Sequence, residues 1–374
     1  MVVRPSKSSP FRFAELAPDD PVGRDEVVAA LLDRARAGRF VLLTAPRRFG
    51  KTTLVHRLRR VADGDPIVVI ADLQGVRDLG MLAQRLAASW RDLPASLPRQ
   101  VLDHVSSRIA GLNAGGLGVS LRHRDPNDPG PLESVLAVPV EVAERTGRRV
   151  LVVLDEFQEI APISGADAII RSQIQHHADQ VAYIFQGSEE SILLGLFDHG
   201  ERPLYGQAER FRLEPFDLGL LGAFVTERFA DTGRRVSGSA LELYLTVTGG
   251  HPQRAMRLAD ELWHRTPDGG TADVADVDAA LEAVLAEAST GFADLWGTFD
   301  HHERWTLGLI VDGRSLFGPE AEAIGLGEGT VRSAVDRLRR KRVLREADGY
   351  GRAALHIIDP LLALWLHRTA SAGG

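Results

Sequence analysis

The chain of 374 residues carries 44 Lys and Arg against 51 Asp and Glu, which gives a formal net charge of −7. Its hydrophobic fraction of 44% and charged fraction of 25% are ordinary for a globular protein and exclude a largely disordered chain. The acidic balance excludes a protein that coats nucleic acid through an overall positive charge, but it leaves a local basic patch open.

The sequence contains no cysteine, which excludes disulfides, cysteine zinc sites, iron–sulfur clusters and thiol nucleophiles. No apolar run approaches the roughly 20 residues that a membrane-spanning helix needs. The first residues also lack the apolar segment of a secretory signal. We therefore expect a cytoplasmic protein that does not associate with a membrane.

Strand and helix patterns alternate after a polar, proline-containing tail over residues 1–20. Four apolar runs have the length of buried strands, at 40–44, 67–71, 150–154 and 181–185. Apolar residues at three- and four-residue spacing predict helices between them, at 23–38, from 51 onward, and at 78–110, 132–146 and 166–178. We also expect a short strand at 115–121 and a loop at 124–131. This alternation predicts an α/β fold with a parallel sheet that helices cover on both faces.

The predicted strands stop after Pro215 and resume only as short pieces near residue 343. Residues 216–290 form four helical segments, broken at Gly233, Gly249–Gly250 and 267–270. The remaining residues predict helices near 300–311, 318–325 and 328–341, with short strands around 343 and 355–358. We therefore predict four parts: a tail (1–20), an α/β core (21–215), a helical domain (216–290) and a C-terminal domain (291–374).

A phosphate-binding pattern stands between a predicted strand and a predicted helix. Residues 45–52, APRRFGKT, fit the pattern G-x-x-x-x-G-K-[ST] except at its first position. Backbone N–H groups would surround phosphate oxygens, Lys51 would reach the β- and γ-phosphates, and Thr52 would place its hydroxyl on Mg²⁺. Ala45 replaces a glycine, so its backbone must keep a negative φ. The alternative is a chance Gly-Lys-Thr at a helix start. The predicted nucleotide-binding residues of this segment are Ala45, Pro46, Arg47, Arg48, Phe49, Gly50, Lys51, Thr52 and Thr53.

Two acids directly follow the apolar run at 151–154. An acid at the end of a buried strand is desolvated unless a partner offsets its charge. We expect Asp155 to hold Mg²⁺, directly or through water, and Glu156 to accept a proton from an attacking water as a general base. The alternative is a solvated acidic turn. With the phosphate loop earlier in the chain, the acid pair predicts a nucleotide-binding site.

Seven segments, taken in order, resemble the archaeal-type ATPase family of P-loop proteins, which is related to the STAND and AAA+ classes and to origin-initiator ATPases. They are PVGRDEVVAALL (21–32), APRRFGKTTL (45–54), VLVVLDEFQEI (150–160), YIFQGSEESI (183–192), PLYGQAERFRLEPF (203–216), TGGHPQRAM (248–256) and IIDPLLALWL (357–366). The resemblance covers nearly the whole chain. It implies an αβα P-loop core with a parallel sheet, a helical lid over 216–290 and a winged helix over 291–374.

The resemblance also implies roles for residues of the core. Val22, Gly23 and Arg24 match the segment that lines the adenine pocket, and an ordinary helix entry is the alternative. Ser188 matches the polar sensor that contacts the γ-phosphate or the attacking water, and a plain loop serine is the alternative.

In the lid, Gly250, His251 and Pro252 match a G-x-P motif whose turn brings His251 towards the nucleotide. A capped helix start is the alternative, because proline is common in the first turn of a helix. Arg254 matches a lid arginine that senses the γ-phosphate, although it also fits the exposed face of a helix. Gln207 stands where family members often carry an arginine. The remaining candidates for an arginine finger are Arg171, Arg202 and Arg210.

The helix predicted at 328–341 is rich in cations. If it enters a major groove, Thr330, Arg332 and Ser333 would face bases, and the arginines at its end would contact phosphates. The alternative is a domain that packs on the lid and transmits the nucleotide state to a partner protein. The cations of this segment are Arg332, Arg337, Arg339, Arg340, Lys341 and Arg342.

Two pairs of adjacent histidines, at 176–177 and 301–302, do not predict a metal site. Neighbouring side chains on a helix point about 100° apart, so such a pair is not expected to chelate one ion.

Together these features predict a Mg²⁺-dependent ATPase that acts as a nucleotide-driven regulatory switch on a partner protein or DNA, with nucleotide-dependent oligomers as a further expectation. Lys51, Glu156 and Ser188 are the predicted catalytic residues, and Thr52 and Asp155 are the predicted metal ligands. One alternative is an initiator- or regulator-like DNA-binding protein in which ATP hydrolysis is incidental. The other is a small-molecule kinase, which would need a pocket for an acceptor.

Overall fold

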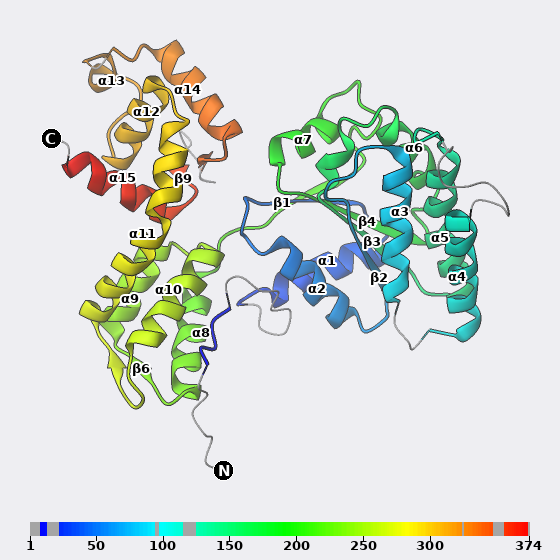
Figure 1. The fold of residues 1–374 in the computed structure, drawn as a ribbon, viewed down its shortest axis with the longest axis horizontal. Helices are drawn as coiled ribbons and strands as arrows, with labels where there is room; N and C mark the ends of the chain where they lie inside the picture. Colours follow the sequence, from blue (N-terminus) through cyan, green and yellow to red (C-terminus); the bar gives the residue numbers. More distant parts are fainter. Residues whose placement is uncertain are drawn as a thin grey trace. The chain divides into compact units, whose positions relative to one another are not determined.

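The computed structural model of the protein describes residues 8–12, 22–93, 97–114, 125–323, 325–346 and 355–372 (Figure 1). The chain divides into two units. We call residues 16–214 the core unit, and residues 1–15 with 215–374 the C-terminal unit. The short strand expected at 115–121 lies outside the described residues.

A five-stranded parallel sheet with strand order β2-β3-β4-β1-β5 runs through the core unit. Its first four strands confirm the strands predicted from apolar runs, and they are largely buried because helices cover both faces. The sequence analysis missed β5, whose sequence Glu-Arg-Phe-Arg contains no apolar run. The strands are β1 (Val41–Thr44), β2 (Ile67–Asp72), β3 (Val150–Asp155), β4 (Val181–Gln186) and β5 (Glu209–Arg212).

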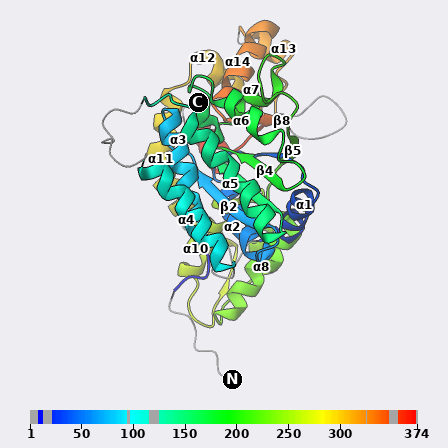
Figure 2. The same cartoon turned by 90° about the vertical axis from the view of Figure 1, so that its right-hand side faces the viewer.

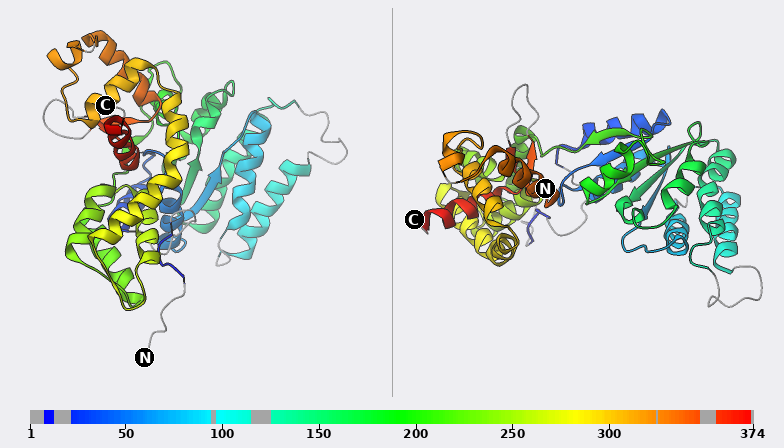
Figure 3. Two further views of the ribbon diagram at one scale, coloured as in Figure 1. Left: turned by 60° about the vertical axis from the view of Figure 1, so that its left-hand side comes forward. Right: turned by 90° about the horizontal axis from the view of Figure 1, so that it is seen from above.

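Helices lie on both faces of this sheet. Helices α1 and α2 contact strands from one side, and α3 to α6 cover the other side (Figures 1 and 3). Figure 2 shows α4 beside α5, which it contacts along its length. The core helices are α1 (Asp25–Arg36), α2 (Lys51–Ala62), α3 (Leu79–Ser89), α4 (Arg99–Ala114), α5 (Gly130–Thr146), α6 (Ala166–Ile174) and α7 (Glu190–Asp198), with short 3-10 helices η1 (Trp90–Asp92) and η2 (Phe157–Ile160).

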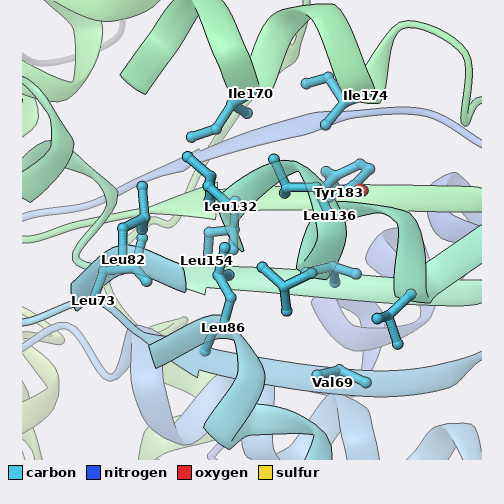
Figure 4. Packing of buried hydrophobic residues seen from close by; sticks show 14 of the residues in the cluster. Val69, Leu73, Leu82, Leu86, Leu132, Leu136, Leu154, Ile170, Ile174 and Tyr183 are labelled. Atoms are coloured by element: carbon cyan, nitrogen blue, oxygen red, sulfur yellow. The ribbon is translucent and has the colours of Figure 1, made fainter. Parts of the chain in front are cut away.

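The apolar layer between the sheet and α3, α5 and α6 fixes the strands that end at the site (Figure 4). Alternate residues of β3 and β4 point into this layer, and each fully buried aliphatic or aromatic side chain contributes about 1.5–3 kcal/mol. The carboxyl ends of β3 and β4 are therefore held rigidly. The side chains labelled in the figure are Val69, Leu73, Leu82, Leu86, Leu132, Leu136, Leu154, Ile170, Ile174 and Tyr183.

The C-terminal unit is mainly helical. The four segments predicted over 216–290 are α8 (Leu218–Asp231), α9 (Gly238–Thr248), α10 (Pro252–Arg265) and α11 (Val274–Gly297). They are followed by α12 (His301–Val311), α13 (Pro319–Ala323), α14 (Glu328–Arg340) and α15 (Pro360–Ala372). The expectation that strands stop after Pro215 was wrong, because the two-residue strands β6 (Arg235–Val236) and β7 (Thr271–Ala272) pair in parallel within 216–290. Strands β8 (Leu344–Glu346) and β9 (Leu355–Ile357) pair antiparallel. The division into a lid and a winged helix stays a prediction.

Residues 8–12 of the expected tail belong to the C-terminal unit. The side chain of Phe11 is buried, and its ring centroid lies 6.1 Å from that of Phe224 and 5.7 Å from that of Phe229. This segment therefore packs on α8 through an aromatic cluster. Across the described ranges, every helix is too short or too polar to cross a bilayer.

Candidate functional site

The predicted phosphate loop joins the end of β1 to the start of α2. Gly50 precedes the helix with a φ of 81°, and no described side chain caps the first turn of α2. The first amides of a helix lack partners within it, so this turn can accept an anion. Positive φ values in the loop occur at Arg48 and Gly50 and not at Ala45. Alanine in place of the first glycine is thus accommodated without a left-handed backbone.

Lys51 is buried beneath this loop. Its Nζ donates hydrogen bonds to the carbonyl oxygens of Ala45 at 2.8 Å and Pro46 at 3.1 Å. These bonds hold the ammonium group at the inner side of the loop, and its charge reaches Glu156, whose pKa it helps to lower. Lys51 therefore binds the loop by hydrogen bonds and lies near enough to the predicted general base to lower its pKa.

Thr52 and Asp155 meet although 103 positions separate them in the sequence. The Thr52 hydroxyl Oγ1 donates to Asp155 Oδ2 at 3.1 Å. Burial raises the pKa of Asp155, while the neighbouring Gln186 side chain and the backbone amide of Glu156 lower it. A hydroxyl and a carboxylate, both hard oxygen donors, are thus placed together in a position where a cation would offset the buried charge.

Glu156 follows β3 in a left-handed conformation, with a φ of 53°. Its Oε2 accepts hydrogen bonds from the Ser188 amide at 3.0 Å, the Ser188 hydroxyl at 2.8 Å and Gln158 Nε2 at 2.5 Å. Burial would raise the pKa of Glu156, but the hydrogen bonds from Gln158 and Ser188 and the charge of Lys51 outweigh it and lower the pKa. The predicted sensor Ser188 therefore donates hydrogen bonds directly to the predicted general base, Glu156.

The sequence analysis missed two glutamines at this edge of the sheet. Gln158 lies on η2, and the last residue of β4, Gln186, is fully buried. The Gln186 amide lies close enough to Asp155 to lower the pKa of that carboxyl, yet neither its oxygen nor its nitrogen meets hydrogen-bond geometry with a described group. A polar residue that ends an apolar strand is the signal that could have indicated Gln186.

The segment expected to line an adenine pocket precedes α1. Val22 is buried, Gly23 is exposed, and Arg24 is a buried residue whose guanidinium donates to the carbonyl oxygen of Glu214 at 2.8 Å. Burial lowers the pKa of Arg24 to about 10, and the charge of Glu214 opposes this shift. Arg24 thus ties the start of α1 to the end of the core unit.

Other predicted core residues have different surroundings. Phe49 is buried, and the exposed side chain of Arg47 forms a long ion pair of 3.7 Å with Glu189. The candidates for an arginine finger are each engaged within the core unit. Arg171 donates to Gln175 at 2.7 Å, Arg202 pairs with Asp167 at 3.1 Å, and Arg210 pairs with Asp198.

The predicted lid residues lie in the C-terminal unit, at the start of α10. His251 caps this helix and is buried, with Nδ1 accepting from the Arg254 amide at 3.4 Å, and Pro252 is its first residue. The Arg254 side chain does not stand on an exposed face. Its guanidinium forms a bidentate ion pair with Asp359 instead.

Arg337 of α14 and Lys341, which follows this helix, form ion pairs inside the C-terminal unit. Arg337 pairs with Asp300 at 3.0 Å and with Glu303 at 3.3 Å, and Lys341 pairs with Glu303 at 2.6 Å. The Glu303 side chain is only 1% exposed, so these cations neutralise a buried charge. Arg332 differs, because its side chain is 69% exposed. Its described ion pair is with Glu328, one turn away on the surface of the same helix.

The reasoning against a shared site for His301 and His302 was wrong in its geometry. Their ring centroids lie 3.8 Å apart at the start of α12, and with Asp300 they place three ligand atoms within 4.8 Å of one another. Asp300, however, caps α12 and pairs with Arg337. Its carboxylate is already occupied by structural partners.

Comparison with known proteins supports the fold. Neither a protein-family model nor a curated protein matches the sequence. Among solved structures, the chain is similar to a Walker-type ATPase of Pyrococcus abyssi, with 17% identity and a TM-score of 0.67 over 94% of this chain and 98% of that one. It is also similar to the ORC2 protein of Aeropyrum pernix in ADPNP–ADP complexes, with 14% identity and a TM-score of 0.52 over 96% of this chain and 98% of that one. The chain therefore has the α/β P-loop fold of these ATPases, as the sequence predicts.

Proposed function

We propose that this protein binds ATP with Mg²⁺ at the carboxyl end of its parallel sheet and hydrolyses it. The observation that carries the proposal is the hydrogen bond of 3.1 Å between Thr52 and Asp155. It joins the phosphate loop after β1 to the acids after β3, and Ser188 follows β4, the strand that lies between them. The elements of a phosphoryl-transfer site thus converge at one edge of the sheet.

The similar structures support the nucleotide part of this proposal. The ORC2 protein of Aeropyrum pernix was solved with ADPNP and ADP, and the Pyrococcus abyssi protein is described as a Walker-type ATPase. We infer that the loop of this chain holds the phosphates through the backbone N–H groups of residues 45–53, except Pro46, which has no N–H. On the same proposal, Val22, Gly23 and Arg24 line the adenine pocket.

The residues at the site fit Mg²⁺. Asp155 is buried, and among the described residues its oxygens accept hydrogen bonds from two neutral donors, the Thr52 hydroxyl and the Glu156 amide. A buried carboxylate with neutral donors gains from a nearby cation, and Mg²⁺ prefers oxygen ligands. Thr52 and Asp155 would hold the ion, directly or through water. When bound, Mg²⁺ supplies positive charge that stabilises the charge on the phosphate oxygens.

The reaction transfers the γ-phosphoryl group to water. The oxygen of water forms a bond to the γ-phosphorus, the bond from this phosphorus to the bridging oxygen breaks, and ADP and phosphate leave. Glu156 accepts the proton of the attacking water, and its lowered pKa keeps it ionised for this purpose at neutral pH. Lys51 and the loop amides stabilise the developing negative charge.

We further propose that ATP binding and hydrolysis drive a regulatory switch, in which His251, Pro252 and Arg254 respond to the nucleotide. Such a switch requires ATP to bind two states of the protein with different affinity. A partner protein or DNA would bind the ATP-bound and ADP-bound states with different affinity. Nucleotide binding would also change the oligomeric state of the protein. Limited proteolysis with and without ATP tests this step, because unchanged cleavage in the segment 216–290 would contradict it.

The test of the activity compares three proteins with and without duplex DNA. We expect wild type to release phosphate from ATP with no added acceptor, Lys51→Ala to lose nucleotide binding, and Glu156→Gln to bind ATP but stop turnover. Phosphate release without an acceptor also excludes the small-molecule kinase. Equal turnover in all three proteins contradicts the mechanism.

The alternative role as a DNA-binding protein has its own test. Arg332 and Arg340 are exposed cations of α14, as this role requires, whereas Arg337 and Lys341 are held by Glu303. A DNA-binding protein predicts a salt-sensitive gel shift that is lost when Arg332 and Arg339 are replaced together. A shift that persists in this variant contradicts readout by α14.

A further inference from the structure

We propose that Gln158 is a positioning residue that holds the Glu156 carboxylate against Ser188, an inference that rests on the proposed hydrolysis. Gln158 lies on η2, two residues beyond Glu156, and the residue is 4% exposed. Its Nε2 donates to Glu156 Oε2 at 2.5 Å, and the same oxygen accepts both hydrogen bonds from Ser188. The Glu156 carboxylate is thus held by hydrogen bonds from Gln158 on η2 and from Ser188, which follows β4.

The chemistry fixes the orientation of the Gln158 amide. A carboxylate accepts hydrogen bonds and cannot donate them when ionised, so only the NH₂ end of the amide can face Glu156. The opposite end, Oε1, is buried and has no hydrogen-bond partner among the described residues. Leaving a buried carbonyl oxygen unpaired costs free energy, and the charge-assisted bond to Glu156 is what offsets this cost.

The missing side chain of Gly187 leaves room for the Gln158 amide. A Cβ atom placed on Gly187 would lie 1.8 Å from Gln158 Oε1 and 3.0 Å from its Cδ. The nearest backbone atom, the amide nitrogen of Phe157, would be 3.6 Å away, which is an ordinary contact. Glycine between β4 and Ser188 therefore makes space for the Gln158 side chain.

This arrangement explains why the site needs a second polar residue beside the base. Glu156 has a left-handed backbone conformation. A glutamate side chain adopts one of several staggered rotamers unless its surroundings select one. A general base must lie within hydrogen-bond reach of its water, and a displacement of about 1 Å can cost roughly 100-fold in rate. Gln158 restricts the carboxylate to one position without touching the substrate itself.

The geometry offers two independent ways to remove the contact. Gln158→Ala deletes the amide, and Gly187→Ala displaces it, because the clash is with the flexible end of the side chain. In the double variant the new Cβ enters the space that the glutamine has left. If both substitutions act through this contact, kcat of the double variant is no lower than kcat of either single variant. If they act independently, the two fold-reductions in kcat multiply.

The experiment measures steady-state ATP hydrolysis by all three variants, after circular dichroism and thermal unfolding have shown that they fold. We expect kcat to fall about 10-fold to 100-fold in each, as for loss of one hydrogen bond to a charged group, with the KM for ATP within about twofold of wild type. Gln84→Met and Gly195→Ala are the controls, since Gln84 is exposed and a Cβ on Gly195 meets only an ordinary contact at 3.8 Å. Wild-type kcat in Gln158→Ala, or multiplied effects in the double variant, overturns the inference.

A second measurement does not depend on turnover. In crystals of the nucleotide-free proteins, we expect the Glu156 carboxylate to remain on Ser188 in wild type and Gly195→Ala, and to leave it in Gln158→Ala and Gly187→Ala. A carboxylate that stays on Ser188 in all four overturns the role of Gln158, even in a protein that hydrolyses ATP. A wild type without turnover but with the expected movement instead contradicts the proposed function alone.

Discussion

The guanidinium of Arg254 forms a bidentate ion pair with the carboxylate of Asp359, which lies 105 positions later in the sequence. Nε lies 3.0 Å from Oδ1 and 3.1 Å from Oδ2, and a terminal nitrogen lies 2.5 Å from Oδ2. Asp359 also accepts the amide of Leu361 at 3.1 Å, at the start of α15. Arg254, which matches a nucleotide sensor of the lid, is thus bound to Asp359, the residue directly before α15. A contact of nucleotide with Nε or Nη2 of Arg254 would compete with Asp359 for these donors.

Removing this ion pair should destabilise the C-terminal unit. The side chains of Arg254 and Asp359 are only 11% and 25% exposed, so a single truncation leaves a poorly solvated charge. We expect Asp359→Ala to lower the free energy of unfolding by about 2 kcal/mol, since it also removes a helix cap. Urea denaturation measures this loss. Arg332→Ala, which breaks an exposed pair, should cost about 0.5 kcal/mol or less. Equal effects of the two variants would contradict the assignment.

The two glycines before His251 should differ in their tolerance of alanine. Gly250 has a φ of 71°, and a Cβ there would lie 2.4 Å from the carbonyl oxygen of Phe216. Gly249 has a φ of 52°, but a Cβ there meets nothing within 4 Å. We expect Gly249→Ala to cost about 1 kcal/mol from backbone strain alone, and Gly250→Ala at least twice as much. Thermal unfolding of both variants provides the comparison, and a reversed order would refute the explanation.

Neutralising Asp155 should stabilise the nucleotide-free protein while it removes the metal ligand. Burial raises the pKa of Asp155, which means that its charged form is unfavourable in the folded state. We expect Asp155→Asn to raise the free energy of unfolding at pH 7, because the neutral amide avoids the cost of burying a charge. The same variant should lose the Mg²⁺ dependence of ATP binding. A destabilised Asp155→Asn protein would show that the carboxylate is structural.

His177 should make the protein less stable below pH 6.5. It is buried with Nδ1 2.9 Å from the Tyr183 hydroxyl, and burial lowers its pKa from 6.5 to about 4. Between these values the unfolded chain binds a proton that the folded chain does not, so stability falls as the pH falls. The full effect is about 3 kcal/mol and is complete near pH 4. Urea denaturation at pH 7.5 and 5.0 should show a smaller pH effect in His177→Asn than in wild type. An equal pH effect in both proteins argues against this role.

Most of the sheet and half of the site could be predicted from the sequence, because their signals are local. Apolar runs of four to six residues mark strands that are buried on both faces, and the phosphate loop and acid pair each occupy consecutive positions. β5 gave no such signal, because three of its four residues are charged, and the exposed Arg210 and Arg212 alternate with the partly buried Glu209 and Phe211 at the edge of the sheet.

The contacts of the site are harder to predict, because they depend on which residues the fold brings together. Ser188 was expected near the phosphate from resemblance alone, whereas its hydrogen bonds to Glu156 appear only in three dimensions. The engagement of Gln158 depends on the space beside Gly187, which no sequence pattern describes. The partner of Arg254 is equally remote in sequence, so an exposed helix face was a reasonable but wrong alternative for this residue.

Isothermal titration calorimetry of the folded protein with ATP and Mg²⁺ tests the central claim most directly. The arrangement of Lys51, Thr52 and Asp155 predicts saturable binding of one nucleotide per chain in wild type and its loss in Lys51→Ala. The exposed-site variant Arg332→Ala should bind as wild type does. Wild-type protein that gives no binding signal with ATP and Mg²⁺ over a range of temperatures would contradict the account.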